Sequence, residues 1–195
     1  QTGFSEQEPD QWLEAAKKVI SALIQATPDM TSKLQGISFS GQMHSLVVLD
    51  ENKQSIRPAI LWNDVRTSKQ CQEITEKAGD LVLGITKNIA LEGFTLPKIL
   101  WIQENEPENW EKVRYMMLPK DYLGFWLTGT FATDFSDAAG TLLLDIVKKE
   151  WAQPILDTFD IPIERLPKLF ESQDQIGVLT DEMKALFGTE VDVPV

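Results

Sequence analysis

Short strand-like segments and longer helix-like segments alternate along this chain from one end to the other. Between residues 8 and 26, apolar side chains such as Trp12, Val19 and Leu23 recur at helical spacing, with charged residues between them. Because the two kinds of segment are interleaved and not collected into separate blocks, the pattern predicts an α/β fold. Strands are predicted at residues 36–40, 45–49, 56–62, 113–118 and 190–195, and further helices at residues 67–78, 95–105 and 181–187.

Several residues are predicted to set the ends of these helices. Ser5 and Glu8 have the spacing of a capping box before the first helix. Gly79 is predicted to end the helix that begins near residue 67, and Thr95 is predicted to cap the helix after it. Since neither an internal repeat nor a long linker interrupts the sequence, one compact domain is the economical interpretation of residues 1–195.

The balance of charge excludes some classes of partner. The 195 residues include 18 Lys+Arg and 30 Asp+Glu, which gives a formal net charge of -12. A surface this acidic is a poor match for the phosphate backbone of nucleic acids. No apolar run approaches the roughly 18–20 residues of a membrane-spanning helix, and no signal-peptide pattern opens the sequence. We therefore expect a cytoplasmic protein with neither nucleic acid nor a membrane as its partner.

One cysteine and one histidine limit the chemistry available to the chain. Cys71 has no second cysteine with which to form an internal disulfide, and His44 has no second histidine with which to build a zinc cluster. A hydrolase would need His44 as its base, yet no carboxylate adjoins it and no Gly-x-Ser-x-Gly motif accompanies it. Glycine-rich phosphate loops do not occur either. No metal site is predicted.

His44 nevertheless lies where a ligand could be bound. The stretch Gly41-Gln42-Met43-His44 separates two predicted strands, and such connections leave side chains free to face a cleft. A neutral imidazole offers one hydrogen-bond donor and one acceptor to a polyhydroxylated ligand. The alternative interpretation is a structural histidine whose hydrogen bonds are satisfied within the fold.

A second candidate cluster closes the third predicted strand. Trp62-Asn63-Asp64-x-Arg66 places an indole, an amide, a carboxylate and a guanidinium within one turn. The indole could pack on the C–H face of a sugar while Asn63 and Asp64 bond paired hydroxyls. The alternative is that Asp64 caps the following helix and Arg66 is an ordinary surface residue.

Five blocks of this sequence resemble, in the same order, the bacterial xylulokinases, which belong to the FGGY family of carbohydrate kinases. One block, residues 93–105, is similar to the signature helix that the family shares. The resemblance runs from about Ser5 to Val195, which is under half of a complete family member. The other blocks lie at residues 41–44, 57–66, 118–123 and 136–141.

The resemblance implies an actin-like, ribonuclease-H-like α/β fold with a mixed sheet and flanking helices. A complete member would bind its sugar mainly through the N-terminal domain, and ATP and Mg²⁺ in the cleft between that domain and a C-terminal one. Residues 1–195 would form most of the N-terminal domain, without its first strand and phosphate-binding turn and without the catalytic-aspartate segment after Val195. The C-terminal ATP-binding domain would be absent, so both ends look cut.

The resemblance also implies which residues meet the sugar. Because Gly93 has no side chain, it could contribute only shape or backbone. Asp134 and Asp137 do not align with the family's catalytic aspartate, so no catalytic residue is expected in this chain. One or both of these aspartates are expected to hold a turn. The sugar-binding residues implied are Met43, His44, Trp62 and Gly93, followed by their neighbours Gln42, Asn63, Asp64 and Arg66.

An intact enzyme of this kind would use ATP to phosphorylate D-xylulose to D-xylulose 5-phosphate, and this chain alone is expected to be inactive. The Gln42-Met43-His44 block favours xylulose. The alternatives are an FGGY kinase for another ketose or polyol, such as ribulose, gluconate or glycerol, and a non-catalytic sugar-binding relative. The expected partners are the sugar and the missing C-terminal domain. Relatives form dimers, which makes a homodimer one alternative, but the acidic surface offers no legible interface and the sequence leaves the oligomeric state open.

Overall fold

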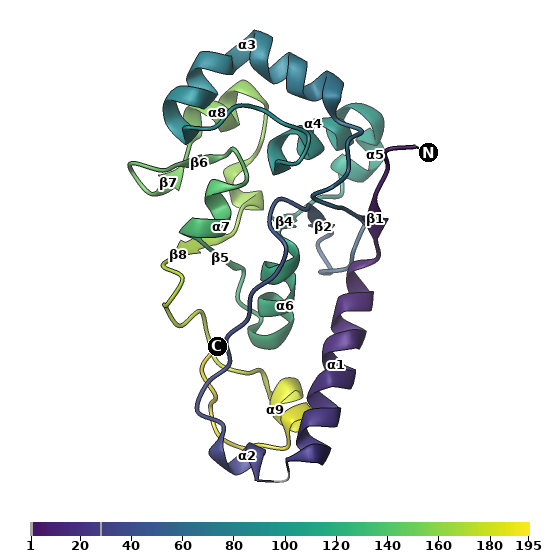
Figure 1. Cartoon of the computed structure of the whole chain (residues 1–195), viewed down its shortest axis with the longest axis vertical. Coiled ribbons are helices and arrows are strands. Elements are labelled where there is room, and N and C mark those ends of the chain that lie inside the picture. The colour runs from purple at the N-terminus through teal and green to yellow at the C-terminus, as the bar shows by residue number, and fades with distance from the viewer. Residues whose placement is uncertain (1, 28) are drawn as a thin grey trace.

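The computed structural model describes residues 2–27 and 29–195, and its helices and strands alternate along the chain as the sequence pattern predicts (Figure 1). None of the described helices is long and apolar enough to span a membrane. The helices are α1 (Pro9–Ala26), α2 (Met30–Lys33), α3 (Ser68–Thr86), α4 (Thr95–Asn105), α5 (Pro107–Trp110), α6 (Pro119–Thr128), α7 (Phe135–Ala139), α8 (Gln153–Thr158), α9 (Asp181–Phe187) and a 3₁₀ turn at Ile163–Arg165. The strands are β1 (Glu6–Gln7), β2 (Val47–Leu49), β3 (Ala59–Ile60), β4 (Tyr115–Met117), β5 (Ala132–Asp134), β6 (Leu144–Asp145), β7 (Glu150–Trp151) and β8 (Lys168–Phe170).

The strands are short and of mixed direction. β5 and β8 pair in parallel, whereas β1 with β3, β2 with β4, and β6 with β7 pair antiparallel. Two backbone hydrogen bonds between Leu46 and Ile60, of 2.9 and 3.2 Å, connect the start of β2 to β3. The α/β fold predicted from the sequence is therefore confirmed, but among the described residues the mixed strands form four two-stranded sheets and not one continuous sheet.

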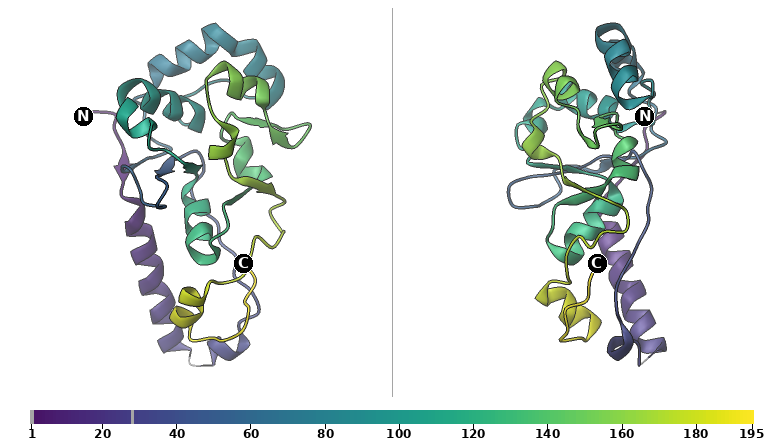
Figure 2. Two further views of the ribbon diagram at one scale, coloured as in Figure 1. Left: turned by 180° about the vertical axis from the view of Figure 1, so that it is seen from behind. Right: turned by 90° about the vertical axis from the view of Figure 1, so that its left-hand side faces the viewer.

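The molecule is elongated, with α3 at one end and α2 and α9 at the other (Figure 1). Helix α1 runs along one side and contacts α6 and α9. From α2, the segment of residues 34–45 returns toward the middle of the molecule, as the edge-on view shows (Figure 2). This return path leads from the end that carries α2 and α9 and places the Gly41–His44 block near the middle of the molecule.

Helix α4 lies at the centre of the largest apolar cluster. Its residues Leu96, Ile99 and Ile102 are completely buried, and they pack in one cluster with side chains from α3, β2 and α8. Smaller clusters lie between α1 and α6 and around α9. Burial of this kind is the main favourable contribution to folding. The helix that was predicted at residues 95–105 therefore forms the main part of the core beside the candidate residues.

Two predicted strands are wrong. Residues 36–40 are extended but lie outside the regular strands, and Ile37 donates a backbone hydrogen bond of 2.9 Å to Pro194. At the C-terminal end, residues 193–195 run antiparallel to residues 176–179. Leu179 donates a backbone hydrogen bond of 3.0 Å to Val193, and Val195 donates one of 3.0 Å to Gly177, but these bonds form only one isolated bridge, between Val178 and Pro194. An alternating pattern marks a segment that suits a sheet, but a strand also needs a neighbouring backbone edge in register. Here the neighbouring backbone is present, but the pairing is too short to form a regular strand.

Three predicted helix boundaries are also corrected. Ser5 does not cap α1, because residues 6–7 form β1 and the Ser5 N–H bonds to Asp64. The helix predicted to end at Gly79 does break at Ala78, whose φ of -150° is not helical, but a second helical stretch follows at once and α3 continues to Thr86. Thr95 lies inside α4, whose N-cap residue is Phe94. In each case tertiary contacts replace the local signal.

A buried ion pair ties the N-terminal strand to the end of β3. The Asp64 carboxylate is wholly buried and accepts hydrogen bonds from the Ser5 N–H at 2.6 Å and from Arg66 Nη2 and Nε at 2.6 and 2.9 Å. Arg66 Nη1 lies 2.7 Å from Glu6 in β1. The guanidinium also lies 3.7 Å from the ring centroid of Phe4 and 4.7 Å from that of Trp101. These contacts fix the backbone that follows Trp62.

The protonation of Asp64 is governed by the same contacts. Burial alone would raise the pKa of this carboxyl, but the hydrogen bonds from Arg66 and Ser5 outweigh that effect and leave the pKa below its ordinary value of 3.8. A carboxyl with a lowered pKa stabilises the folded protein while it is ionised. This stabilisation is present above pH 3.8 and is lost as the pH falls through the lowered pKa of the folded state.

We predict that Ile99→Ala lowers the free energy of unfolding by about 2–5 kcal/mol, because it leaves a cavity in the largest cluster. Urea unfolding curves measure the change. The matched control is Ile89→Ala, since Ile89 is 60% exposed whereas Ile99 is 0% exposed. The control should change the free energy of unfolding by less than about 0.5 kcal/mol. Equal effects of the two substitutions would contradict this placement of α4.

We predict that Asp64→Asn destabilises the protein by about 3–5 kcal/mol near neutral pH, because it leaves the buried Arg66 without its carboxylate. Unfolding should be measured as a function of pH. The difference between the parent and the variant should be constant above the ordinary carboxyl pKa and shrink in more acidic buffer, as Asp64 of the parent becomes protonated. A difference that grows as the pH falls would be inconsistent with the ion pair.

Candidate functional site

A strained turn presents His44. Its φ is 69°, in the left-handed region that residues other than glycine adopt infrequently. The Ser45 N–H donates a hydrogen bond of 2.8 Å to the Met43 carbonyl, which closes a three-residue turn around His44. On the other side, the Thr95 hydroxyl at the start of α4 donates to the His44 carbonyl at 3.0 Å. Helix α4 therefore holds this turn directly.

The His44 ring is held in a defined orientation and tautomer. Its Nδ1 lies 2.7 Å from the carbonyl oxygen of Gly140, which follows α7. Because a carbonyl oxygen can only accept, Nδ1 carries the hydrogen, and Nε2 of the neutral ring is an acceptor. The ring of Phe94 packs edge-on against the imidazole with 4.9 Å between centroids. The turn thus offers Nε2 as an acceptor for a hydroxyl.

Trp62 is joined to the same turn through Ser45. The buried Ser45 Oγ accepts a hydrogen bond of 2.8 Å from the Trp62 N–H and donates one of 2.8 Å to Gln42 Oε1. The Trp62 side chain itself is 55% exposed, which is unusual for so large an aromatic ring. Gly93 completes the group, since a Cβ on this residue would lie 3.4 Å from the Trp62 carbonyl. Asn63 is exposed beside Trp62.

The loop that carries Gly93 is organised by a buried lysine. Lys98 of α4 is 0% exposed, and its ammonium donates to the carbonyls of Glu92, Gly93 and Phe94 at 2.9, 2.6 and 2.9 Å. Burial lowers the pKa of Lys98 to about 8. Sequence reasoning missed this residue. The available signal was a lysine set in a run of apolar helix residues, where an unpaired charge would be costly.

Two of the predicted sugar ligands have a structural role instead. The carboxylate of Asp64 is fully buried, and the Arg66 side chain is 2% exposed. Their polar atoms already bond to each other and to Ser5 and Glu6. A ligand would have to displace these contacts to reach either side chain. We therefore propose that Asp64 and Arg66 act as an ion pair that supports Trp62 and Asn63, and that neither side chain contacts the sugar.

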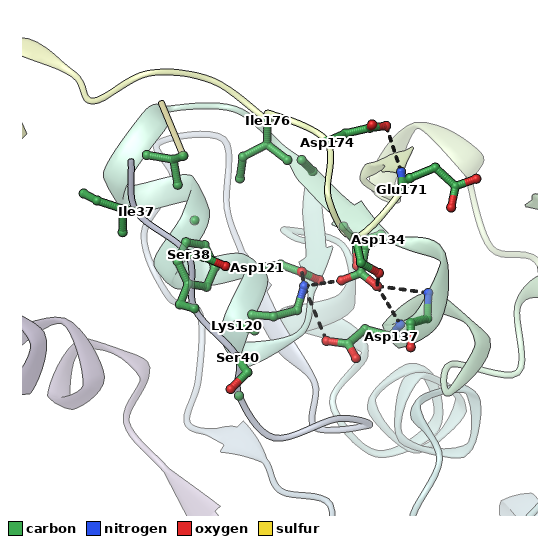
Figure 3. Close-up of a pocket in the computed structure, with 18 residues that line it drawn as sticks. Ile37, Ser38, Ser40, Lys120, Asp121, Asp134, Asp137, Glu171, Asp174 and Ile176 are labelled. Atoms are coloured by element: carbon green, nitrogen blue, oxygen red, sulfur yellow. Dashed lines mark hydrogen bonds and ion pairs between the residues drawn. The ribbon is translucent and has the colours of Figure 1, made fainter. Parts of the chain in front are cut away.

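A cavity of about 260 Å³ lies next to the Gly41–His44 block (Figure 3). Its polar centre is the Lys120 ammonium, which lies 3.1 Å from Asp121, 2.6 Å from Asp134 and 3.4 Å from Asp137. Ser40 and Gly41 also line the cavity, and Gly41 packs against Lys120, since a Cβ on Gly41 would lie 3.2 Å from Cβ of Lys120. Met43, His44 and Trp62 do not belong to its lining. The cavity is therefore a neighbour of the predicted sugar residues and does not contain them.

The charged groups of this cavity shift one another's pKa values. Burial raises the pKa of Asp121 to about 6, although Lys120 acts in the opposite direction. Burial also raises the pKa of Asp137. For Lys120, burial lowers the pKa, but the three carboxylates outweigh it and the pKa is raised. Lys120 is thus a cation that partly neutralises an acidic wall, a role that sequence reasoning did not identify.

Of Asp134 and Asp137, which were predicted to hold a turn, Asp134 is confirmed in that role. Its carboxylate accepts hydrogen bonds from the backbone N–H groups of Ser136 at 2.9 Å and Asp137 at 3.1 Å, which caps α7. Helix α7 ends at Gly140, the residue that bonds His44. The cavity and the imidazole are therefore connected through one short helix.

Within residues 2–27 and 29–195, there is no group of three or more His, Cys, Asp or Glu side chains that could hold a metal ion. An exposed indole and an oriented imidazole that are linked through Ser45 are typical of a site for a ligand with both C–H and hydroxyl surfaces.

Comparison with known proteins finds similar sequences and a similar structure. The xylulose kinase of Lactococcus lactis subsp. lactis is 61% identical over 181 residues, which are 93% of this chain and 36% of that protein. The xylulose kinase of Bacillus subtilis is 48% identical over 95% of this chain and 37% of its own length. A crystal structure described as a xyloylose kinase from Brucella ovis superposes with a TM-score of 0.96 at 38% identity, over 100% of this chain and 40% of that one.

The chain thus spans little more than a third of the length of the two curated relatives. One protein-family description matches residues 1–195 throughout: the FGGY family of carbohydrate kinases, N-terminal domain. Since the match covers the whole sequence, this chain belongs to the FGGY family of carbohydrate kinases and corresponds to its N-terminal domain.

Proposed function

We propose that this chain is the sugar-binding part of an ATP-dependent kinase whose full-length protein converts D-xylulose to D-xylulose 5-phosphate. The observation that carries the proposal is the unit formed by the His44 turn and Trp62, which share Ser45 as a hydrogen-bonding partner. Two relatives at 61% and 48% identity are xylulose kinases, which supports a ketose as the ligand.

In this proposal each residue has a physical role. Nε2 of His44 accepts a hydrogen bond from a sugar hydroxyl, because Nδ1 is already bonded to Gly140. The exposed Trp62 ring packs on the C–H face of the sugar. Met43 supplies an apolar contact beside the imidazole. Gln42, Asn63 and Gly93 adjoin these residues and shape the surroundings.

The nucleotide and Mg²⁺ are proposed to be held mainly by parts of the full-length protein outside this chain. The described residues do not fit a metal ion, because they contain no suitable group of ligands and because Lys120 already occupies the centre of the acidic cavity. No step of phosphoryl transfer is therefore assigned to residues of this chain. Consistent with this view, we propose that the chain alone is inactive and that the full-length protein works in the cytoplasm, where ATP is available.

Xylulose must be tested against the other substrates that FGGY kinases phosphorylate. A kinase for ribulose, gluconate or glycerol would use the same arrangement with small displacements, and differences of one hydroxyl are decided by hydrogen-bond placement. A panel of sugars in thermal shift measurements on the full-length protein ranks them, since a ligand that binds only the folded state raises the melting temperature. Binding of sugar without turnover would favour a non-catalytic relative.

We predict that His44→Ala in the full-length protein raises the KM for the sugar by about 10- to 100-fold, because one hydroxyl loses its acceptor. The KM for ATP should change by less than about twofold. Steady-state assays with each substrate varied in turn separate the two effects. An unchanged KM for the sugar would refute the assignment of His44.

We predict that Trp62→Ala raises the sugar KM about tenfold, and that Trp62→Phe, which keeps an aromatic face, raises it less. The matched control is Val65→Ala, since Val65 and Trp62 are both 55% exposed and lie three residues apart. The control should leave the sugar KM unchanged. If the alanine variants at positions 62 and 65 behave alike, the indole has no specific role.

A further inference from the structure

Gly140 lies directly against the two side chains proposed to contact the sugar. A Cβ added to this residue would be 2.6 Å from both Cε1 and Nδ1 of His44 and 3.1 Å from Cε of Met43. Contacts under 3.0 Å are essentially never seen for real Cβ atoms. Any larger residue at position 140 would therefore force the imidazole, the thioether or the end of α7 to move.

The backbone conformation does not explain why glycine is found here. Gly140 has φ -78° and ψ 2°, which any residue can adopt. Its N–H bonds to the Asp137 carbonyl at 3.0 Å, as the end of a helix requires. What is special about the position is the space in front of it, which the His44 ring occupies. The atoms that would be struck first are the ends of two side chains and not backbone atoms.

We propose that Gly140 is a positioning residue for sugar binding, a role that rests on the proposed function of the His44 turn. Its missing side chain lets the imidazole approach within 2.7 Å of its carbonyl, and that carbonyl holds the hydrogen on Nδ1. Together these two features point the acceptor nitrogen Nε2 toward the sugar. A side chain at position 140 would remove both features at once.

The test is Gly140→Ala in the full-length protein, with xylulose and ATP varied separately. We expect the sugar KM to rise at least about tenfold, because the displaced imidazole loses its orientation, while the ATP KM changes by less than about twofold. The matched control is Gly84→Ala, since a Cβ on Gly84 meets no atom within 4 Å. This control should leave both KM values unchanged.

A double-mutant cycle separates positioning from a merely structural role. In the His44→Ala background the ring that Gly140 faces is gone, so adding Gly140→Ala should raise the sugar KM by less than about twofold. If Gly140→Ala alone does not fold but the double variant does, the steric relation to His44 is supported. If neither folds, or if the two substitutions act independently, Gly140 serves the fold and the inference is wrong.

The same experiment distinguishes a failure of this inference from a failure of the proposed function. If His44→Ala leaves the sugar KM unchanged, the His44 turn is not the sugar site and the proposed function fails. If His44→Ala raises the sugar KM and Gly140→Ala does not, the site stands and only the role of Gly140 is overturned.

Discussion

Three backbone carbonyls converge on the ammonium of Lys98, and this interaction connects the core of the protein to its candidate site. The lysine belongs to α4, whose apolar residues build the largest cluster. A buried ammonium needs three acceptors, and the loop at residues 92–94 supplies them. Because Thr95 of the same helix holds the His44 carbonyl, the first turn of α4 positions both Gly93 and the imidazole.

A second buried charge supports the other half of the site. Arg66 packs against two aromatic rings, one of which is Trp101 of α4, and pairs with the buried Asp64. The pair fixes the backbone after Trp62 and leaves the indole exposed. Asp64 and Arg66, which the sequence suggested as ligand contacts, thus pair with each other inside the protein. The residues to which we assign a direct role in binding are the less polar ones, the indole of Trp62 and the imidazole of His44.

Much of the local structure could be predicted from the sequence. Helix α4 spans the predicted residues 95–105, and α9 ends at Gly188, whose φ is 68°. These elements depend on periodicity and on capping residues, which act within one or two turns of a helix. The extended residues 36–40 show the limit of this approach, because a strand depends on a partner that its own sequence does not specify.

The sequence by itself determined the class of fold, the family and the chemical character of the site, because interleaved periodicities and ordered motifs depend on residue order alone. Only the tertiary structure decided which members of each motif are buried and which are exposed. Within Trp62–Arg66, folding buried the two charges as a pair and left the indole exposed. It also brought Gly140 to His44, although they are 96 residues apart in the chain. Contacts between residues so distant arise from packing, which no local pattern encodes.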